Sequence, residues 1–569
     1  MDGGPRSSSD GLEVVCDVLV VGGGAAGCLA AIGARQKGAD VVLAEKGGSI
    51  TRSGNLASGI DHYIAVLGEA PWDTPEGFLA NLEEVNEYLV DMELAGVFAR
   101  EVAAMVRYLE SIGVPFRDKE TGRYRRVPGL SSQKPRLINL EGADVKKLLA
   151  REVHRLGVKV VERMAVHDLL TNGQETVGAV GVGVRSGTFH VFRAKAVVLT
   201  TGGVVRLYPT PSGLTFMSHH CPYNTGDGQA MAFRAGAELT NMEFTYCSIV
   251  PKDFSTAGIS GLVGLGARII NALGERYMEK YHPWGEKAPR NAVVWGTVQE
   301  IKNGRGPCYV DCTHLPPEII GLIKLGIQNE KATTLDFLEA KGIDLGRDPL
   351  EFEPQEFDLG VSFAFGAGSG ILIDKTCATN IEGLFAAGDC THFSFGATSA
   401  NTLGYRAGQE AAKYAGLCST VPSPAEKHLA EHRDRLLAPI NRKEGISHHE
   451  LEEKLRRTMA RYVGFGRNAR GLETALKSLQ TMKGDRQKLL ASNPHELLRS
   501  LESQNLVDVA ETVVTAALER KESRAVPCHY RADFPERDDE NWKKFLVIKK
   551  EDGMTGIKCR STLHEDGSG

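Results

Sequence analysis

The stretch CDVLVVGGGAAGCLAAIGARQKGADVVLAEK at residues 16–46 decides the fold. An apolar run leads into three consecutive glycines and then into an alanine-rich segment, which predicts a strand, a tight turn and a helix. A second apolar run follows and ends at Glu45. Because this order of elements forms the first half of a Rossmann-type unit, the stretch predicts a parallel sheet that binds a dinucleotide.

Each glycine of the turn has its own physical role. Gly22 permits the tight turn, Gly24 lets the backbone approach a pyrophosphate, and Gly27 lets the helix pack on the strand. The helix N-terminus at Ala25 and Ala26 then stabilises the phosphate charge.

The end of the second strand supplies an acid. Glu45, which Lys46 follows, can accept hydrogen bonds from ribose hydroxyls, and a charge-assisted bond of this kind contributes roughly 1.5–3 kcal/mol. A glycine turn alone is a weak signal. The strand, the spacing and the acid together form a specific one, with an NAD-binding unit as the alternative.

Three later motifs favour FAD over NAD. AKAVVLTTGG at 194–203 predicts a strand that ends in two glycines, NTGDGQAMAFRAGAEL follows at 224–239, and NIEGLFAAGDC lies at 380–390. A carboxylate at the end of this last strand suits the ribityl and pyrophosphate part of an extended FAD. Besides the residues of the first unit, the predicted FAD-binding residues are Ser53, Gly54, Thr201, Gly202, Asp227, Gly388, Asp389, Asn401 and Leu403.

Length and composition set the outer limits. The 569 residues exceed the roughly 250–300 that one core supports, so two or three domains are expected. A net charge of -5 argues against a nucleic-acid partner. The eleven cysteines contain no Cys-x-x-Cys pair, so neither an iron-sulfur cluster nor a metal site is expected within the chain. The sequence has no apolar signal segment and no run of about 18 apolar residues, which predicts a cytoplasmic protein without a membrane span.

Further motifs indicate the family. NALGERYMEKY at 271–281, APRNAVVWGTVQEI at 288–301 and KESRAVPCHYRADFPERDDENW at 521–542 join the FAD motifs. Together they resemble the fumarate reductase and succinate dehydrogenase flavoprotein family, which includes the adenylylsulfate reductase α subunit and L-aspartate oxidase. The resemblance runs nearly end to end.

The resemblance implies an α/β fold, α+β overall, with a Rossmann-like FAD-binding domain in two pieces. The first piece is expected at 12–242 and the second at 355–420. A capping domain would be inserted at 243–354 and would close over the flavin, and a C-terminal helical domain with a tail would occupy 421–569.

The resemblance also implies substrate-side residues. In APRN, Arg290 stands where fumarate-reducing members have a proton donor, but Asn291 replaces the Asp of their Pro-Arg-Asp. Arg290 is therefore predicted either to donate a proton or to clamp an anion. In adenylylsulfate reductase an Asn and a Trp flank the flavin, and an Arg and a His hold the sulfur nucleotide. Asn55 corresponds to that Asn, Tyr223 stands only near the position of the Trp, and no residue corresponds to the His. Other candidates near predicted strand ends are His62, Asn139, Glu141, His219, His220, Lys252 and Arg268, of which His220 and Arg268 enter the predicted catalytic set.

Three departures from the family pattern narrow the prediction. Gly54 follows Ser53 where succinate dehydrogenases carry the His that attaches FAD covalently, so the FAD is expected to be non-covalent. Phe365 and Ser399 stand where a His and an Arg hold the carboxylates of fumarate. Losing two charge-assisted bonds would weaken dicarboxylate binding at least about a hundredfold.

The predicted function is that of an FAD-dependent oxidoreductase, the flavoprotein subunit of an adenylylsulfate-reductase-like or fumarate-reductase-like system. Two electrons would pass between FAD N5 and a small anionic substrate, and the electron-transfer partner would be an iron-sulfur subunit. RSG at 52–54 and INLEGADVKKLL at 138–149 look most like the adenylylsulfate reductase α subunit. A dicarboxylate or aspartate-oxidase-like enzyme and a non-catalytic electron relay remain alternatives.

Overall fold

The computed structural model describes residues 11, 13–129, 132–256, 259–360, 363–364, 366–551 and 554–561. Its largest sheet has seven strands in the order β6-β2-β1-β9-β8-β7, with β17 also paired to β9. The strands are β1 (Glu13–Val21), β2 (Val41–Glu45), β6 (Lys159–Glu162), β7 (Met164–Asn172), β8 (Glu175–Gly183), β9 (Phe189–Leu199) and β17 (Leu384–Ala386).

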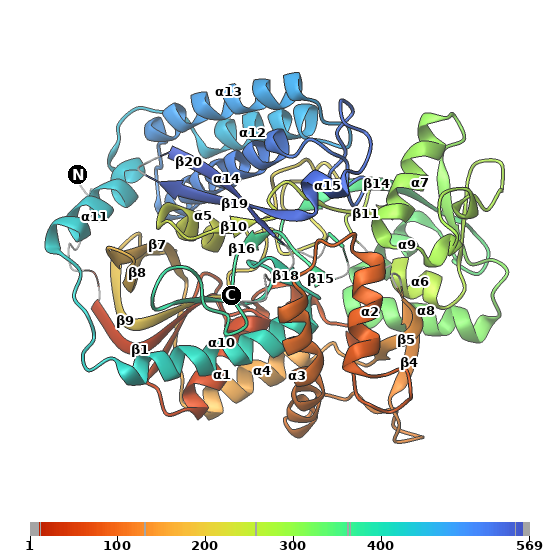
Figure 1. Ribbon diagram of the computed structural model, residues 1–569, viewed down its shortest axis with the longest axis horizontal. Coiled ribbons are helices and arrows are strands. Elements are labelled where there is room, and N and C mark those ends of the chain that lie inside the picture. Colours follow the sequence, from red (N-terminus) through yellow and green to blue (C-terminus); the bar gives the residue numbers. More distant parts are fainter. Residues whose placement is uncertain are drawn as a thin grey trace, which may run out of the picture.

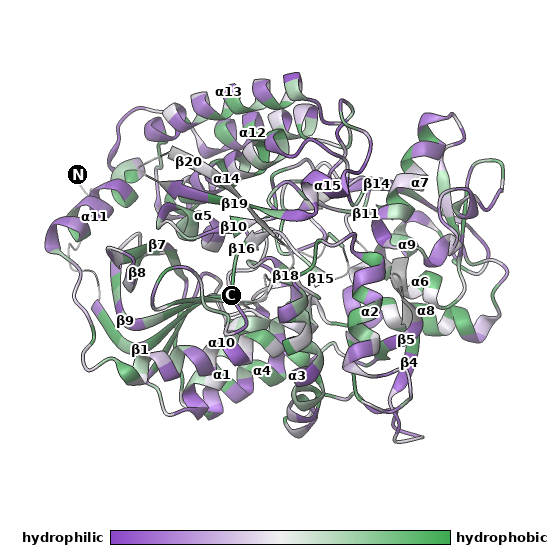
Figure 2. Ribbon diagram, viewed as in Figure 1, coloured by the Kyte–Doolittle hydropathy of each residue, from purple (hydrophilic) through white to green (hydrophobic). Residues whose placement is uncertain are grey.

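The predicted strand, turn, helix and strand at 16–46 are present. β1 pairs in parallel with β2 and with β9, so its apolar half lies at the centre of the sheet and is fully buried. In Figure 2 the strands around β1 are mostly hydrophobic, whereas α11 and the outer faces of α12 and α13 are hydrophilic. The apolar run that predicted β1 therefore reflects burial on both sides of the sheet.

Two helices far apart in sequence pack side by side against this sheet, α1 (Ala25–Gln36) and α10 (Ala397–Leu417) (Figure 1). A side chain at Gly408 would place its Cβ 1.9 Å from the carbonyl oxygen of Ala30. The backbones of the two helices thus touch, and this contact holds the N-terminal turn of α10 beside the glycine turn.

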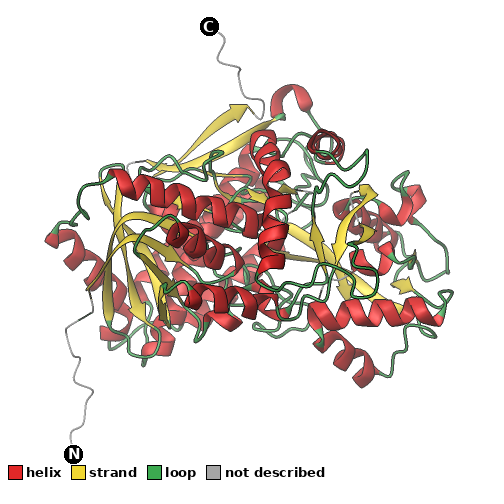
Figure 3. Cartoon of the chain, turned by 90° about the horizontal axis from the view of Figure 1, so that it is seen from below, coloured by secondary structure: helices red, strands yellow, loops and turns green. Residues whose placement is uncertain are grey.

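A second sheet, of four antiparallel strands, lies at the other end of the molecule (Figure 1). It has the order β11-β14-β13-β12 and is accompanied by four helices. Its elements are β11 (Tyr246–Pro251), β12 (Arg268–Ile270), β13 (Cys308–Asp311), β14 (Leu350–Asp358), α6 (Ile259–Gly264), α7 (Arg290–Lys302), α8 (Pro317–Lys331) and α9 (Thr333–Lys341). In Figure 3 one set of strands lies on the left and another on the right, each with helices beside it, and a further pair of strands lies at the top.

This second sheet spans the segment predicted as the capping domain. The boundary predicted at 354 falls within β14, which continues to Asp358 because it pairs with β11 up to Tyr246. The division into domains stays a prediction.

The C-terminal part begins with four helices. α14 is buried on nearly all sides, since α11, α12, α13 and α5 pack around it. The four helices are α11 (Glu426–Asn441), α12 (His448–Tyr462), α13 (Ala469–Asp485) and α14 (Pro494–Glu519), and α5 (Asp227–Arg234) comes from an earlier part of the chain.

The tail adds strands that the sequence did not predict. After α15 (Asp539–Trp542), β19 (Lys544–Glu551) and β20 (Met554–Ser561) form a hairpin. β19 pairs with β10 (Leu239–Thr240), which pairs with β16 (Gly370–Ile371). The expectation of a helical C-terminal unit with a plain tail was incomplete, because these strands join a sheet from the FAD-binding part.

The remaining elements surround the site. β3 pairs with β5, which also pairs with β4, and this small sheet lies beside the second sheet's helices (Figure 1). The elements are β3 (His62–Ile64), β4 (Arg125–Gly129), β5 (Ser132–Asn139), β15 (Gly366–Ala367), β18 (Phe393–Ser394), α2 (Pro75–Val85), α3 (Met92–Ser111) and α4 (Val145–Arg155). Among the described residues, no helix combines the length and apolarity that crossing a bilayer requires.

Candidate functional site

A cavity of about 590 Å³, here called the main cavity, lies where the ends of β1, β2, β9 and β17 meet the starts of α1, α5 and α10. Most of the predicted FAD-binding residues line it. They come from segments that lie far apart in the sequence. They are Gly22, Gly24, Ala25, Ala26, Glu45, Lys46, Ser53, Gly54, Thr201, Gly202, Asp227, Gly388 and Asp389.

The glycine turn leaves a cradle of bare backbone. Gly24 begins α1 and no described side chain caps that helix, so its first N–H groups are free to meet an anion. A Cβ at Gly54 would come within 3.0 Å of the Gly24 Cα, so the two glycines face each other. A cradle with exposed N–H groups and no side chains suits the pyrophosphate of FAD.

Gly27 has the packing role predicted for it and does not line the cavity. A Cβ there would lie 1.8 Å from the carbonyl oxygen of Gly22. Asn401 and Leu403 also fail to line it, because they lie further into α10 and are buried, while the cavity meets the first turn at Ala397 and Thr398. We leave Asn401 and Leu403 out of the site.

Glu45 holds the loop around the turn together. Its Oε2 accepts a hydrogen bond from Gly23 N at 2.6 Å, and its Oε1 accepts one from Gly47 N at 2.5 Å. The carboxylate retains further lone pairs that point into the cavity wall, where they can accept from ribose hydroxyls.

Lys46 and Asp227 belong to a charge network that the sequence did not predict. Lys46 Nζ donates to Asp227 Oδ2 at 2.7 Å and to Glu502 Oε1 at 3.0 Å. Burial would lower the pKa of Lys46, but these two carboxylates raise it above its usual value. Burial would raise the pKa of Glu502, but Lys46 and Arg206 lower it to about 2. The network ties β2, α5 and α14 together beneath the cavity.

At its other end the main cavity is lined by histidines. His220 Nδ1 is hydrogen-bonded to Asp358 Oδ2 at the end of β14. His219 lies against it, with ring centroids 4.1 Å apart, and stacks on Tyr246 at 6.3 Å. Burial, His220 and Lys331 hold the pKa of His219 well below its usual value, so this imidazole is neutral at physiological pH.

Lys331, at the end of α8, lines the same end of the cavity. Its Nζ donates to the carbonyl oxygens of Ser218, His219 and Ser255, at 3.2, 3.1 and 2.9 Å. Burial lowers the pKa of Lys331 to about 8. This lysine fixes the end of α8 to the histidine loop.

Arg290 lies next to this group but is not among the residues that line the main cavity. It begins α7, and its guanidinium carbon lies 4.9 Å from the centre of the Tyr246 ring. Its charge acts on His62, His219 and Glu330. It adds to the lowering of the pKa of His219, and it opposes in small part the stronger influences that raise the pKa values of His62 and Glu330. Asn291 donates to the carbonyl oxygen of Val526 at 3.3 Å, so the residue that replaces the family's Asp is bound to the tail.

Of the other predicted catalytic residues, Asn55 and Tyr223 line the main cavity and Arg268 does not. Asn55 lines the main cavity and accepts a hydrogen bond from Cys221 N at 2.9 Å. Tyr223 also lines it, is 47% exposed and lies 4.9 Å from the guanidinium carbon of Arg499. Arg268 lies exposed on β12 and does not line the main cavity, because that strand is the outer edge of the second sheet. We therefore leave Arg268 out of the site.

The remaining candidates from the sequence, Lys252, Glu141 and Asn139, do not line the main cavity. Lys252 pairs with Glu351 at 2.7 Å, and Glu141 pairs with Lys119 at 2.9 Å, both at the surface. Asn139 donates to the carbonyl oxygen of Asp61 at 2.9 Å.

The Ser399 hydroxyl group makes its hydrogen bonds at the start of α10. Phe395 N donates to its Oγ at 2.6 Å, and the Oγ donates to the carbonyl oxygen of Gly396 at 3.2 Å. The side chain is buried and offers no positive charge. Phe365, the other departure from the family pattern, lies outside the described residues.

The comparison with known protein families gives an FAD-binding domain for the part of the chain that forms the main cavity. Residues 17–404, more than half of the chain, match the FAD binding domain family, and residues 452–565 match the fumarate reductase flavoprotein C-terminal family. The chain belongs to the fumarate reductase and succinate dehydrogenase flavoprotein family. The predicted family and fold class are thereby confirmed.

Members of this flavoprotein family resemble the chain over nearly its full length. A subunit of fumarate reductase (CoM/CoB) from Methanothermobacter marburgensis is 30% identical, covering 94% of this chain and 97% of that protein. L-aspartate oxidase from Streptomyces coelicolor is 28% identical, covering 96% and 93%. The structure of adenylylsulfate reductase from Archaeoglobus fulgidus superimposes with a TM-score of 0.88 at 25% identity, covering 98% and 97%.

Within this family the chain is an FAD-dependent oxidoreductase, and FAD is its cofactor. The residues that sequence reasoning missed are Asp61, Tyr246, Glu330, Lys331, Asp358 and Glu502. Each lies in a segment without a motif, and only their proximity in the fold makes them candidates.

Proposed function

We propose that the chain is the flavoprotein subunit of an adenylylsulfate-reductase-like system, in which two electrons pass between FAD and a small anionic substrate. The observation that carries this is the group of nitrogen-bearing side chains at one end of the main cavity, which are His62, His219, His220 and Lys331, with Arg290 within electrostatic reach.

The residues fit FAD at the opposite end. The bare backbone at Gly24 and Gly54 would hold the pyrophosphate, and Glu45 would hold the ribose. FAD supplies two-electron chemistry when bound. The protein then contributes a cavity, cationic groups for the substrate and groups that hold protons.

The cationic groups at this end of the main cavity favour an anion, and the carboxyl groups of Glu330 and Asp389 line the same cavity. His220 is committed to Asp358, and Lys331 is held by three carbonyl groups. Arg290 lies beside Tyr246, and its charge acts on His219 and Glu330, which line this end of the main cavity. We therefore assign it to the substrate, either as an anion clamp or as part of a proton path. A dicarboxylate oxidoreductase is the second candidate, because one similar protein is named a fumarate reductase and another an L-aspartate oxidase.

Fumarate is expected to leave the reduced protein unchanged. It carries two carboxylates, and Ser399 supplies no charge to either, so enclosing fumarate would leave a carboxylate unpaired. Reduced protein mixed with fumarate in a stopped-flow instrument should recover flavin absorbance no faster than with buffer. Reoxidation at about 1–1000 per second would contradict the prediction and favour the dicarboxylate candidate.

Replacing Arg290 should abolish turnover with the substrate that is accepted, beginning with adenylylsulfate. Arg290→Ala is expected to slow flavin reoxidation about 100- to 1000-fold, as losing a charge-stabilising donor does elsewhere. Arg268→Ala is the matched control, since it removes the same charge from the exposed edge strand β12. Equal rates for the two variants would remove Arg290 from the site.

The flavin itself should be non-covalent. Gly54 offers no side chain for attachment, and its φ of +72° disfavours a replacement residue. Acid precipitation of the yellow protein should release all flavin fluorescence into the supernatant. Fluorescence that stays with the precipitated chain would disprove this expectation.

We also propose an iron-sulfur protein as the electron-transfer partner. The sequence has no Cys-x-x-Cys pair, and the similar fumarate reductase chain is named as one subunit of its enzyme.

A further inference from the structure

A second cavity of about 310 Å³, here called the side cavity, adjoins the main cavity. It lies between the β4–β5 hairpin and helices α6 and α8 of the second sheet. His62 and Glu330 line both cavities, and Asp61 lines the side cavity. These side chains therefore form part of a wall that the two cavities share.

His62 is held in one orientation by its neighbour. Its Nδ1 is hydrogen-bonded to Asp61 Oδ1, and its side chain is 34% exposed. Its Nε2 makes no hydrogen bond to any residue that the structure describes. Burial would lower the pKa of His62, but Asp61 raises it to about 9, so the imidazolium has a proton available at Nε2.

Glu330 is the second titratable group of the wall. Within the described ranges of the chain its carboxyl group has neither a hydrogen bond nor an ion pair, and it lies in the last turn of α8. Burial and the Asp61 carboxylate raise the pKa of Glu330 to about 7, against the opposing charges of His62, Lys331 and Arg290. It is therefore able to gain or lose a proton near neutral pH.

The backbone fixes this wall. Lys331 anchors the end of α8 through its three carbonyl acceptors. On the other side, a Cβ at Gly59 would lie 2.0 Å from the carbonyl oxygen of Asn329, so α8 packs directly on the loop that carries Asp61 and His62. The outer end of the side cavity has an exposed charged rim, which includes Arg117, Lys119, Glu120 and Glu141. Water can enter from that rim.

We propose that Asp61, His62 and Glu330 form a proton relay that connects the side cavity, and through it the solvent, with the main cavity. The proposal rests on the proposed function, because two-electron reduction of bound FAD takes up protons. His62 gives up the Nε2 proton toward the main cavity and is reprotonated by the Glu330 carboxyl group, which then regains a proton from the solvent through water in the side cavity. Asp61 holds the His62 ring by its hydrogen bond to Nδ1 during these transfers. Each transfer breaks one N–H or O–H bond and forms another, and no electron moves through the relay. Water bridges the groups where no direct hydrogen bond joins them.

The relay can be tested with a reductant that carries no protons. Reduced methyl viologen gives one electron per molecule, so every proton that accompanies flavin reduction must come from the solvent. FAD-loaded protein and viologen are mixed anaerobically in weakly buffered solution with a pH indicator, and flavin absorbance and proton uptake are followed together. In the wild type, proton uptake should keep pace with flavin reduction. In Glu330→Gln and His62→Asn it should lag at least tenfold, with unchanged FAD content.

Two control variants separate a relay from a structural role. Glu141→Gln makes the same chemical change at the rim of the same cavity, away from the shared wall, and should behave as wild type. Glu330→Asp restores a titratable carboxyl group and should recover most of the rate. Proton uptake at the wild-type rate in both FAD-loaded Glu330→Gln and His62→Asn overturns the relay and leaves the proposed function intact.

Two further outcomes have distinct meanings. A wild-type protein that binds no FAD overturns the proposed function and the relay with it. If Glu330→Gln does not fold, infrared spectra of the wild type decide, because the protonated carboxyl band assigned to Glu330 should disappear as the pH rises through about 7. A Glu330 carboxyl group that is fully ionised at pH 5 would overturn the relay.

Discussion

Substituting Gly24 by valine is expected to give a folded protein that has lost FAD. Apart from its own chain neighbours, the one atom of the described residues within 4 Å of a Cβ at this position is the Gly54 Cα, at 3.9 Å, so the chain without cofactor has room for the new side chain. The valine methyl groups would fill the cradle where the backbone meets the pyrophosphate. FAD affinity should fall at least about a hundredfold, which corresponds to about 2.7 kcal/mol and is measurable by flavin fluorescence titration.

Two neighbouring substitutions show whether the effect is one of binding. Gly24→Ala adds only the Cβ that fits and should weaken FAD binding much less. Gly27→Val should prevent folding, because its Cβ would lie 1.8 Å from the carbonyl oxygen of Gly22. If Gly24→Val binds FAD as the wild type does, the phosphate is not held at this turn.

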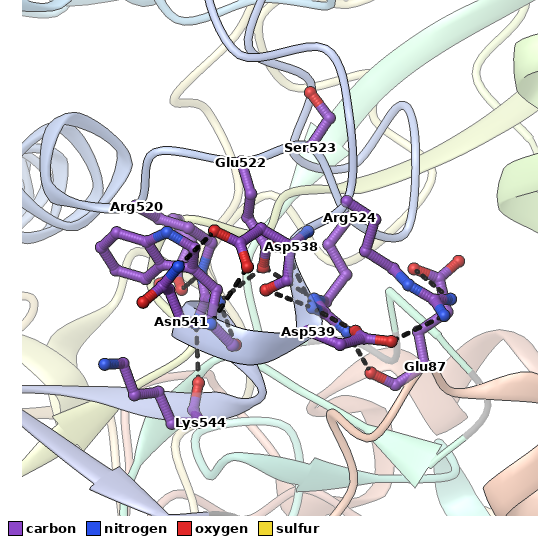
Figure 4. A network of polar contacts seen from close by, with 12 residues as sticks. Glu87, Arg520, Glu522, Ser523, Arg524, Asp538, Asp539, Asn541 and Lys544 are labelled. Atoms are coloured by element: carbon purple, nitrogen blue, oxygen red, sulfur yellow. Dashed lines mark hydrogen bonds and ion pairs between the residues drawn. The ribbon is translucent and has the colours of Figure 1, made fainter.

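Substituting Glu522 by glutamine is expected to destabilise the protein by about 3–5 kcal/mol. Glu522 accepts from Arg520 at 2.9 Å and from Arg524 at 2.7 and 2.9 Å, and all three side chains are fully buried (Figure 4). It also accepts from Asp538 N at 2.9 Å. The substitution leaves two buried guanidinium groups with one carboxylate fewer, and an uncompensated buried charge is costly.

Trp542 is a convenient probe of this network, since the Arg520 guanidinium carbon lies 5.7 Å from its ring. Urea unfolding followed by tryptophan fluorescence should show the loss. Glu519→Gln, three residues earlier and exposed, is the matched control and should change stability by no more than about 0.5 kcal/mol. If both variants unfold at the same urea concentration, the buried network does not stabilise the tail.

The sequence predicted those parts of the site whose geometry is local. The turn at Gly22 to Gly27 has the spacing of a strand, a turn and a helix, and the structure has these elements at these residues. The acidic residue Glu45 was predicted at the end of the second strand, and β2 ends at this residue. Short spacing carries this information because backbone geometry within a few residues leaves little choice.

Predictions were less successful where they depended on the direction in which a side chain leaves its helix or strand. Asn401 and Leu403 were predicted to touch FAD, but both side chains are buried away from the main cavity, and the Asn401 amide donates to the Tyr63 hydroxyl. Arg268 was predicted near a strand end, but its strand is an edge and the side chain is exposed. Whether a side chain lines a cavity depends on how its helix or strand packs against the neighbouring elements.

The sequence by itself determined the family, the FAD-binding fold and the cofactor, because motifs of fixed spacing encode them. Only the tertiary structure decided that His62 and Glu330 share a wall between two cavities, and that Glu502 lies beside Lys46, 456 residues away. Such contacts join segments far apart in the sequence and depend on how helices pack on the sheet. The physical reason is that the pKa and role of a buried charge are set by its neighbours in space, which local sequence does not specify.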